Sequence, residues 1–327
     1  MQSASGHIQY GTMNKPHLSD KILERFACES FFSELTTSNH LDELKRCGDT
    51  IRFKREPHAV VHPYEKNQKL KFDHLEIDHA VIQDSKGLYF AIKLDDVDEK
   101  QICDSPMMID MYTKSAMHQF KRAIELDVLT TMLYGVDEMN QGCCAGFQTQ
   151  CYNLGDCGAP LHINCENMWT WLASLMAVHT EACIVAPGNG TSLCGPTGDG
   201  GSLFIALPYK AYPLLVMALS KGFCCPIKDS TPTITGRIPE MLHGFTLFFT
   251  HDLPYIVEND ERVYQVVSGR RDATGFCVTM EKTETTRPAE YFATFYKGLI
   301  TWATGVIYPE ALALSRVVFD DVSIPKA

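Results

Sequence analysis

The sequence lacks the features that mark exported and membrane-spanning chains. Its first residues are polar and contain no basic flank followed by an apolar run, so we expect no export signal. The longest apolar region runs from Leu203 to Leu219. It is interrupted by prolines and a charge, at Pro208, Lys210 and Pro213. This region is therefore not a membrane span, and we expect no membrane partner.

Positive charge is scarce as well. The chain has 29 lysines and arginines against 40 aspartates and glutamates, which gives a net charge of −11. A protein that grips DNA phosphates is usually basic, at least locally. The charge therefore argues against a nucleic-acid reader, although solubility at high copy number explains it equally well.

Motifs for catalysis, cofactors and metals are also missing. The glycine-rich stretch 188–201 lacks the Lys-Ser/Thr pair that completes a phosphate-binding Walker loop. No paired-carboxylate, metalloprotease or serine-elbow motif is present. The histidines between residues 58 and 79 are interpreted as surface or interface residues. We therefore expect no catalytic residues, no cofactor and no metal site.

Cysteine, in contrast, is abundant. The thirteen cysteines of a chain without an export signal should be reduced thiols when the protein folds. The dense region from Cys143 to Cys165 also contains His162, but it does not give the paired C-x-x-C spacing of a zinc site. Packing as small apolar side chains is the favoured interpretation. Four cysteines are candidates for oxidation between copies of the chain: Cys143, Cys144, Cys151 and Cys157.

The cysteines leave one enzymatic alternative open. Cys194 and His179 could act as thiol nucleophile and base in a small cysteine-dependent α+β enzyme. No protease signature surrounds either residue. A large closed particle or a stable monomer with thiol-dependent turnover would distinguish the two functions.

The stretch from residue 86 to 135 organises the chain. A strand from Leu88 to Leu94 leads into an acidic segment, residues 95–99, and then into a pattern typical of one long helix ending at Gly135. An aspartate at its start should cap the first free N–H groups. Pro106 predicts a kink or a late start near Cys103. One apolar row recurs every fourth residue, at Met108, Tyr112, Ala116, Phe120, Ile124, Val128 and Met132, beside a second row at Ile109, Met111 and Ala123.

A hairpin is predicted before this stretch. Residues 50–55, 59–64 and 70–78 alternate apolar and polar side chains, and residues 65–68 suit the tip. Only one face is apolar, and an isolated two-stranded hairpin is marginal in water. We therefore expect the hairpin to lie on other structure, including another copy of the chain.

The remainder alternates predicted strands and helices. We expect a loop region at 136–160, a helix at 166–180 capped by Asn164, and a buried strand and helix at 202–207 and 210–220. Further strands are predicted at 246–250, 289–295, 304–308 and 311–319.

Three phrases together resemble the major capsid proteins of tailed phages with the HK97 fold. The first is the strand, acidic segment and long helix. The second is GFTLFFTHDLP at 244–254, and the third is GLITWATGVIYPEAL at 298–312. Their order and spacing bracket most of the chain, from about residue 48 to 320, and make the resemblance specific.

The resemblance implies an α+β fold, that of an HK97-like capsid subunit. Its parts would be an N-terminal arm at 1–47, an extended β-hairpin loop at 48–92 and a peripheral domain with a long spine helix at 93–158. An axial domain would follow at 159–290, and C-terminal strands of the peripheral domain at 291–327.

The resemblance also implies a function. The chain would self-assemble as hexamers and pentamers into an icosahedral shell enclosing double-stranded DNA, and its acidic charge suits such a wall. Assembly would occur in the host cytoplasm and the product would be the virion capsid. Expected partners besides itself are a portal, the packaged DNA, an optional decoration protein and a separate scaffolding protein. The scaffolding protein is expected because only about 47 residues precede the hairpin, whereas self-scaffolding relatives carry a long charged helical extension.

Charge predicts where neighbouring copies meet. Residues 48–71 contain six basic and three acidic residues, whereas residues 72–104 contain nine acidic and three basic residues. We expect hairpin-tip lysines to contact the acidic segment of an adjacent copy: Lys66 and Lys69 against Asp95, Asp96, Asp98 and Glu99. The alternative is that both charged stretches simply face solvent and make no contact between copies. No positional match indicates covalent Lys–Asn cross-links.

Overall fold

The computed structural model describes residues 35–36, 50–54, 62–63, 66, 69, 72, 79–83, 86–101, 105–185, 203–222, 241–242 and 244–321. The chain forms two compact units. Unit 1 combines Met1–Ser30, Gly87–Lys121 and Met280–Thr301, and unit 2 combines Phe31–Lys86, Arg122–Thr279 and Trp302–Ala327. Most of the predicted N-terminal arm, the predicted strands 59–64 and 70–78, and Cys194 lie outside the described residues.

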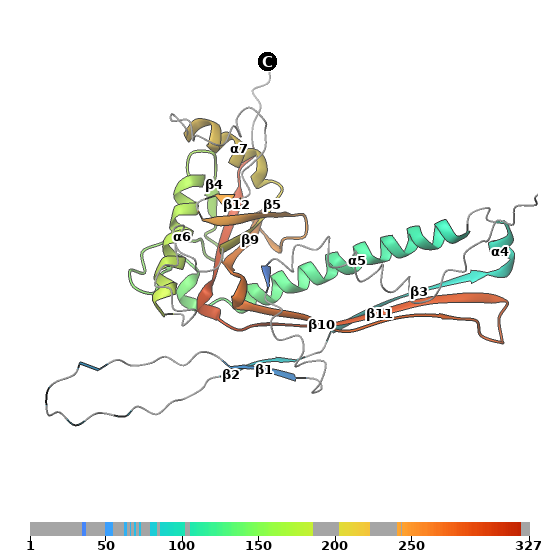
Figure 1. The fold of residues 1–327 in the computed structure, drawn as a ribbon. Coiled ribbons are helices and arrows are strands. Elements are labelled where there is room, and N and C mark those ends of the chain that lie inside the picture. The colour runs from blue at the N-terminus through green and yellow to red at the C-terminus, as the bar shows by residue number, and fades with distance from the viewer. Residues whose placement is uncertain are drawn as a thin grey trace, which may run out of the picture. The chain divides into compact units, whose positions relative to one another are not determined.

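Most residues of a three-stranded sheet belong to unit 1. It is built from β3 (Lys86–Asp95), β10 (Thr274–Thr286) and β11 (Ala293–Val306), in the order β10-β11-β3 (Figure 1). Exposure alternates along β3, as expected for a strand with one covered face. Leu88, Phe90 and Ile92 point to the covered side, which confirms the predicted strand.

Two helices follow β3 where the sequence predicted one. Helix α4 (Asp96–Gln101) is followed by α5 (Ser105–Tyr134). Pro106 is the second residue of α5, a position where its missing N–H breaks no helical hydrogen bond. The described part of α5 begins at Ser105, close to the predicted late start near Cys103, and residues 102–104 lie outside the described residues. The predicted aspartate cap belongs to α4, because Oδ1 of Asp95 accepts a hydrogen bond from the N–H of Val97 at 3.0 Å.

The predicted apolar row of α5 is buried only in its second part. Ile124, Val128 and Met132 are fully buried, whereas Tyr112 is 41% exposed. Met111, in the second predicted row, is 59% exposed. The first turns of α5 therefore present apolar side chains to solvent.

Unit 2 is built around a seven-stranded mixed sheet. Its strands are β4 (Leu161–Ile163), β5 (Leu203–Pro208), β6 (Met241–Leu242), β7 (Phe245–Thr250), β8 (Tyr255–Glu258), β9 (Glu261–Arg270) and β12 (Leu312–Phe319). Their order is β4-β12-β9-β5-β7-β6, with β8 paired to β9. Strands β5 and β7 are parallel, and β9 runs antiparallel to β12 and β5. Every residue of β5 is buried, which places this strand in the core.

Helices α6 (Met168–Val185) and α7 (Ala211–Gly222) belong to the same unit. The predicted cap of α6 is confirmed, since Oδ1 of Asn164 accepts hydrogen bonds from the N–H groups of Glu166 (2.9 Å) and Asn167 (3.0 Å). The strands predicted at 202–207, 246–250 and 311–319 are also confirmed as β5, β7 and β12.

The two strands predicted at 289–295 and 304–308 are wrong. A single strand, β11, runs through both, and residues 287–292 form the connection from β10. Two glycines lie within β11, Gly298 and Gly305, and at each another side chain occupies the space that a Cβ would need. Phe90 fills that space at Gly298, and Ile82 fills it at Gly305.

The predicted domain limits separate strands that the structure pairs. They assign residues 312–319 to the peripheral domain, yet β12 is hydrogen-bonded to β9 and β4, which the same limits assign to the axial domain. The division into arm, loop, peripheral and axial domains stays a prediction.

The base of the predicted hairpin is present in unit 2. Strand β1 (Thr50–Lys54) pairs antiparallel with β2 (His79–Gln83), with Lys54 opposite His79. Most of the predicted tip at 65–68 lies outside the described residues, so its position stays a prediction. Lys66 lies in a turn.

Candidate assembly surfaces

The acidic segment divides into carboxylates used within the chain and carboxylates that face solvent. Asp95 caps α4, and Asp96 forms an ion pair with Arg287. The N–H of Asp96 also donates to the carbonyl of Phe292 at 3.0 Å. Asp98 is exposed, and Glu99 lies in α4 beside it. Within unit 1, the segment is thus fastened to the β10–β11 connection while Asp98 stays available.

Exposed apolar side chains surround this junction. Val97 is 61% exposed, Tyr291 52% and Phe292 85%. We call these three residues the tip patch. Nζ of Lys93 lies 4.9 Å from the ring centroid of Tyr291. This cation–π contact favours one orientation of the exposed ring. Clustered exposed aromatics of this kind are typical of protein interaction sites.

The two predicted hairpin lysines are both exposed. Lys66 and Lys69 belong to unit 2, whereas the acidic segment belongs to unit 1. Their contact with the acidic segment of a neighbouring copy stays a prediction.

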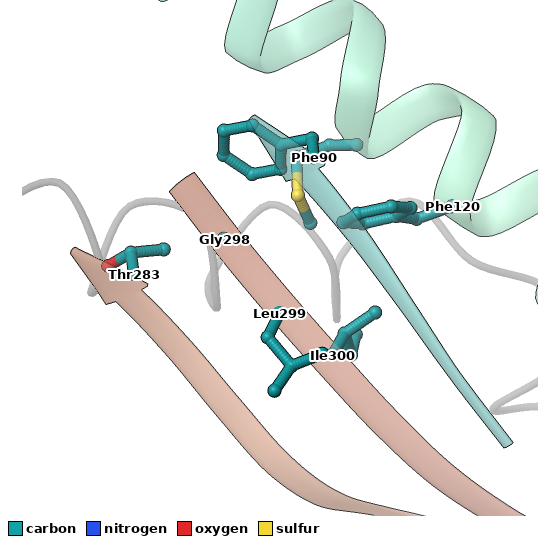
Figure 2. A pocket seen from close by; sticks show the side chains of 7 residues that line it. Phe90, Phe120, Thr283, Gly298, Leu299 and Ile300 are labelled. Atoms are coloured by element: carbon teal, nitrogen blue, oxygen red, sulfur yellow. The ribbon is translucent and has the colours of Figure 1, made fainter. Parts of the chain in front are cut away.

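Between the start of α5 and the sheet lies a small apolar cleft within unit 1. Figure 2 shows Phe90 and Phe120 facing it from β3 and α5, above Gly298 and Ile300 of β11. The rings of Phe90 and Phe120 are 5.9 Å apart, and those of Phe90 and Tyr112 6.4 Å. The space inside is about 10 Å³, at the lower limit for one water molecule. The cleft is therefore part of the packing rather than a ligand site.

The alternative enzymatic base is not available for catalysis. His179 is 1% exposed, and its Nε2 lies 2.8 Å from Oγ of Ser268. Burial, together with the nearby charge of Arg270, lowers the pKa of His179 to about 3. The ring is therefore neutral and packs against Phe245. His179 serves the core of unit 2.

Two carboxylates that the sequence did not single out hold unit 2 together. Asp127 accepts a hydrogen bond from Nε1 of Trp302 at 2.9 Å and pairs with Nζ of Lys86 at 2.5 Å. Glu181 accepts hydrogen bonds from the N–H groups of Gln148 and Thr149 and from the Thr149 hydroxyl, at 2.9, 3.1 and 2.7 Å. Burial acts to raise the pKa of Glu181, but these hydrogen bonds outweigh it and the pKa lies below its ordinary value.

Neither a metal site nor a membrane helix is found in the described part of the chain. Among those residues, no three His, Cys, Asp or Glu side chains gather closely enough to hold a metal ion. None of the helices described is both long and apolar enough to cross a membrane.

Comparison with known proteins identifies the fold. No protein-family model matches the sequence, and neither does any curated protein. Solved structures do match. A structure of Mycobacterium phage Che8 has a TM-score of 0.59 at 14% identity, covering 89% of this chain and 91% of that one. The mature capsid of bacteriophage PhiM1 has a TM-score of 0.59 at 12% identity, with coverage of 99% and 93%. The capsid of cyanophage P-SCSP1u has a TM-score of 0.54 at 14% identity, with coverage of 88% and 85%.

Proposed function

We propose that this chain, which has the α+β fold of tailed-phage capsid structures, is a major capsid protein. Many copies assemble as hexamers and pentamers into an icosahedral shell that encloses double-stranded DNA. The shell forms in the host cytoplasm with a scaffolding protein and a portal, and it can take a decoration protein.

The observation that carries this proposal is the extent of the structural likeness. It spans 99% of this chain and 93% of the PhiM1 capsid chain, so it includes the sheets and helices of both units. A likeness confined to one sheet would support only a shared substructure. The acidic net charge of −11 supports a wall that does not adhere to the DNA it contains.

Exposed apolar surface supports self-association. The tip patch exposes Val97, Tyr291 and Phe292, and the first turns of α5 expose Met111 and Tyr112. Burying apolar area contributes about 25 cal/mol per Å². Met111 and Tyr112 lie on helix α5, which lowers the entropy cost of fixing this surface in a contact.

The hairpin supplies the second kind of contact. We infer that Lys66 and Lys69 lie against the acidic segment of an adjacent copy, where the carboxylate of Asp98 is exposed. Asp95 and Asp96 add to the negative electrostatic potential of the segment, but each already has a partner within its own chain. A single exposed ion pair contributes only about 0–1 kcal/mol. The contact matters because it is repeated at every hairpin of the shell.

Charge reversal tests this arrangement. The variant Lys66→Glu/Lys69→Glu should fold normally but fail to form shells. Adding Asp98→Lys should restore assembly, since it recreates an opposite pair without removing the cap of α4 or the partner of Arg287. A matched control, Lys114→Glu/Lys282→Glu, makes the same change in net charge at exposed lysines outside the hairpin.

Sedimentation and negative-stain microscopy provide the readout, and circular dichroism verifies folding. Normal shells from the hairpin variant would contradict the charge contact while leaving the capsid assignment intact. Failure of the control variant as well would show that net charge, and not this contact, governs assembly.

A further inference from the structure

Two adjacent cysteines lie at a rigid turn of unit 2. Cys143 and Cys144 occupy the turn between Gly142, which has φ = +83°, and Ala145. Ala145 exchanges two backbone hydrogen bonds with Tyr152, at 2.8 and 3.1 Å, and Leu154 donates to the carbonyl of Gly142 at 2.9 Å. The backbone on both sides of the two cysteines is therefore held in place.

The following residues are fixed as well. Gly146 donates to the carbonyl of Met139 at 2.7 Å, and the carboxylate of Glu181 holds Gln148 and Thr149. This anchoring means that the positions of the two thiols are set by the fold and not by a loop that can rearrange freely.

Both thiols are exposed and close together. Sγ of Cys143 lies 3.6 Å from Sγ of Cys144. The hydrogen bond between the two thiols, and then the charge of Cys143, raise the pKa of Cys144. Cys151 has a different neighbour, since its Sγ lies 3.2 Å from Oγ1 of Thr149.

The separation of the two sulfurs suits one shared ligand atom. A disulfide requires an S–S distance of about 2.0 Å, so the pair would have to close considerably. Two thiolates at about 2.3 Å from one tetrahedral ion stand roughly 3.8 Å apart. The observed 3.6 Å is near the second arrangement. Soft, thiophilic centres prefer sulfur ligands of this type.

We propose that Cys143 and Cys144 form a vicinal dithiol site. It chelates a thiophilic atom that needs two sulfur ligands, such as the arsenic of a trivalent arsenical. With phenylarsine oxide, both sulfurs bond to arsenic and the As=O bond breaks. The two thiol protons leave with that oxygen as water, and no atom changes its oxidation state. This site needs only two protein ligands, unlike the zinc motif that the sequence lacks.

The test uses the assembled protein with Cys224→Ser and Cys225→Ser, because these residues form the other adjacent pair in the sequence. One equivalent of phenylarsine oxide is added, a maleimide then labels free thiols, and mass spectrometry locates the labels. We expect Cys143 and Cys144 to lose their labelling together. The bound arsenic should resist a monothiol and be removed by a dithiol.

Single substitutions decide the outcome. Cys143→Ser or Cys144→Ser should each abolish dithiol-specific arsenic binding, whereas the matched control Cys151→Ser should retain it. Arsenic that survives either substitution at the pair, or unchanged labelling of Cys143 and Cys144 after arsenic is added, would overturn the proposal. Serine replaces cysteine at exposed positions here, so all three variants should fold, and circular dichroism verifies this.

Discussion

Replacing Gly298 by alanine should destabilise unit 1 through a single contact. A Cβ on this residue would lie 2.8 Å from Cζ and 3.0 Å from Cδ1 of Phe90, and closer still to Cε1. Phe90 cannot retreat easily, because its ring packs against Tyr112 and also against Phe120, which Figure 2 shows beside it. The added methyl group therefore either displaces the ring or pushes β11 away from β3.

The expected magnitude follows from two opposing terms. Overpacking a well-filled site costs about 1–3 kcal/mol. Alanine also lowers the conformational entropy of the unfolded chain. This stabilises the folded state by about 0.4–1 kcal/mol where alanine can adopt the backbone conformation. Gly298 is not among the glycines with positive φ, so this second term applies. We expect the free energy of unfolding to fall by about 1–2 kcal/mol.

Urea unfolding of the unassembled chain measures the effect. The midpoint should fall while the m-value stays constant, because the exposed area on unfolding does not change. Phe90→Leu should destabilise the parent chain but partly rescue Gly298→Ala, since it removes the ring edge that clashes. Additive effects of the two substitutions, or an unchanged midpoint in Gly298→Ala, would refute the reasoning.

Three further predictions concern pH, covalent chemistry and assembly. The pKa of His179 is about 3 in the folded chain and about 6.5 in the unfolded chain, so the unfolded state binds the proton first as the pH falls. Stability should be complete above pH 6.5 and decline by about 2 kcal/mol by pH 5; a His179→Gln variant with the same pH slope would contradict this. Particles heated in detergent and reductant should release one band near 36.6 kDa, and a ladder of larger species would reveal the cross-links we do not expect. Shells formed without a scaffolding protein should vary in size, and a uniform population would disprove the need for one.

Local signals in the sequence predicted most of the secondary structure. These signals act over a few residues. Apolar residues at every fourth position predict helix α5, Pro106 lies at its start, and Asn164 caps α6. The first hairpin strand was also predictable, because residues 50–54 alternate apolar and basic side chains and form β1. These features depend on backbone sterics and neighbouring side chains alone.

Long-range contacts account for what the sequence did not predict. The close approach of Phe90 to Gly298 joins residues that are distant in the sequence, so no local pattern indicates it. Glu181 lies on a helix, and nothing local indicates that its carboxylate holds residues 148–149. Asp96 was predicted as a contact between copies, and its pairing with Arg287 depends on where the β10–β11 connection folds back.

The size of the particles that the purified chain forms tests the central claim most directly. Sedimentation followed by negative-stain microscopy should show very large closed shells built from a chain of 36.6 kDa. Substituting the tip patch with Phe292→Asp, an 85% exposed residue, should reduce assembly without unfolding the chain. A stable monomer at high concentration, with no closed particles in the presence or absence of a scaffolding protein, would contradict the account.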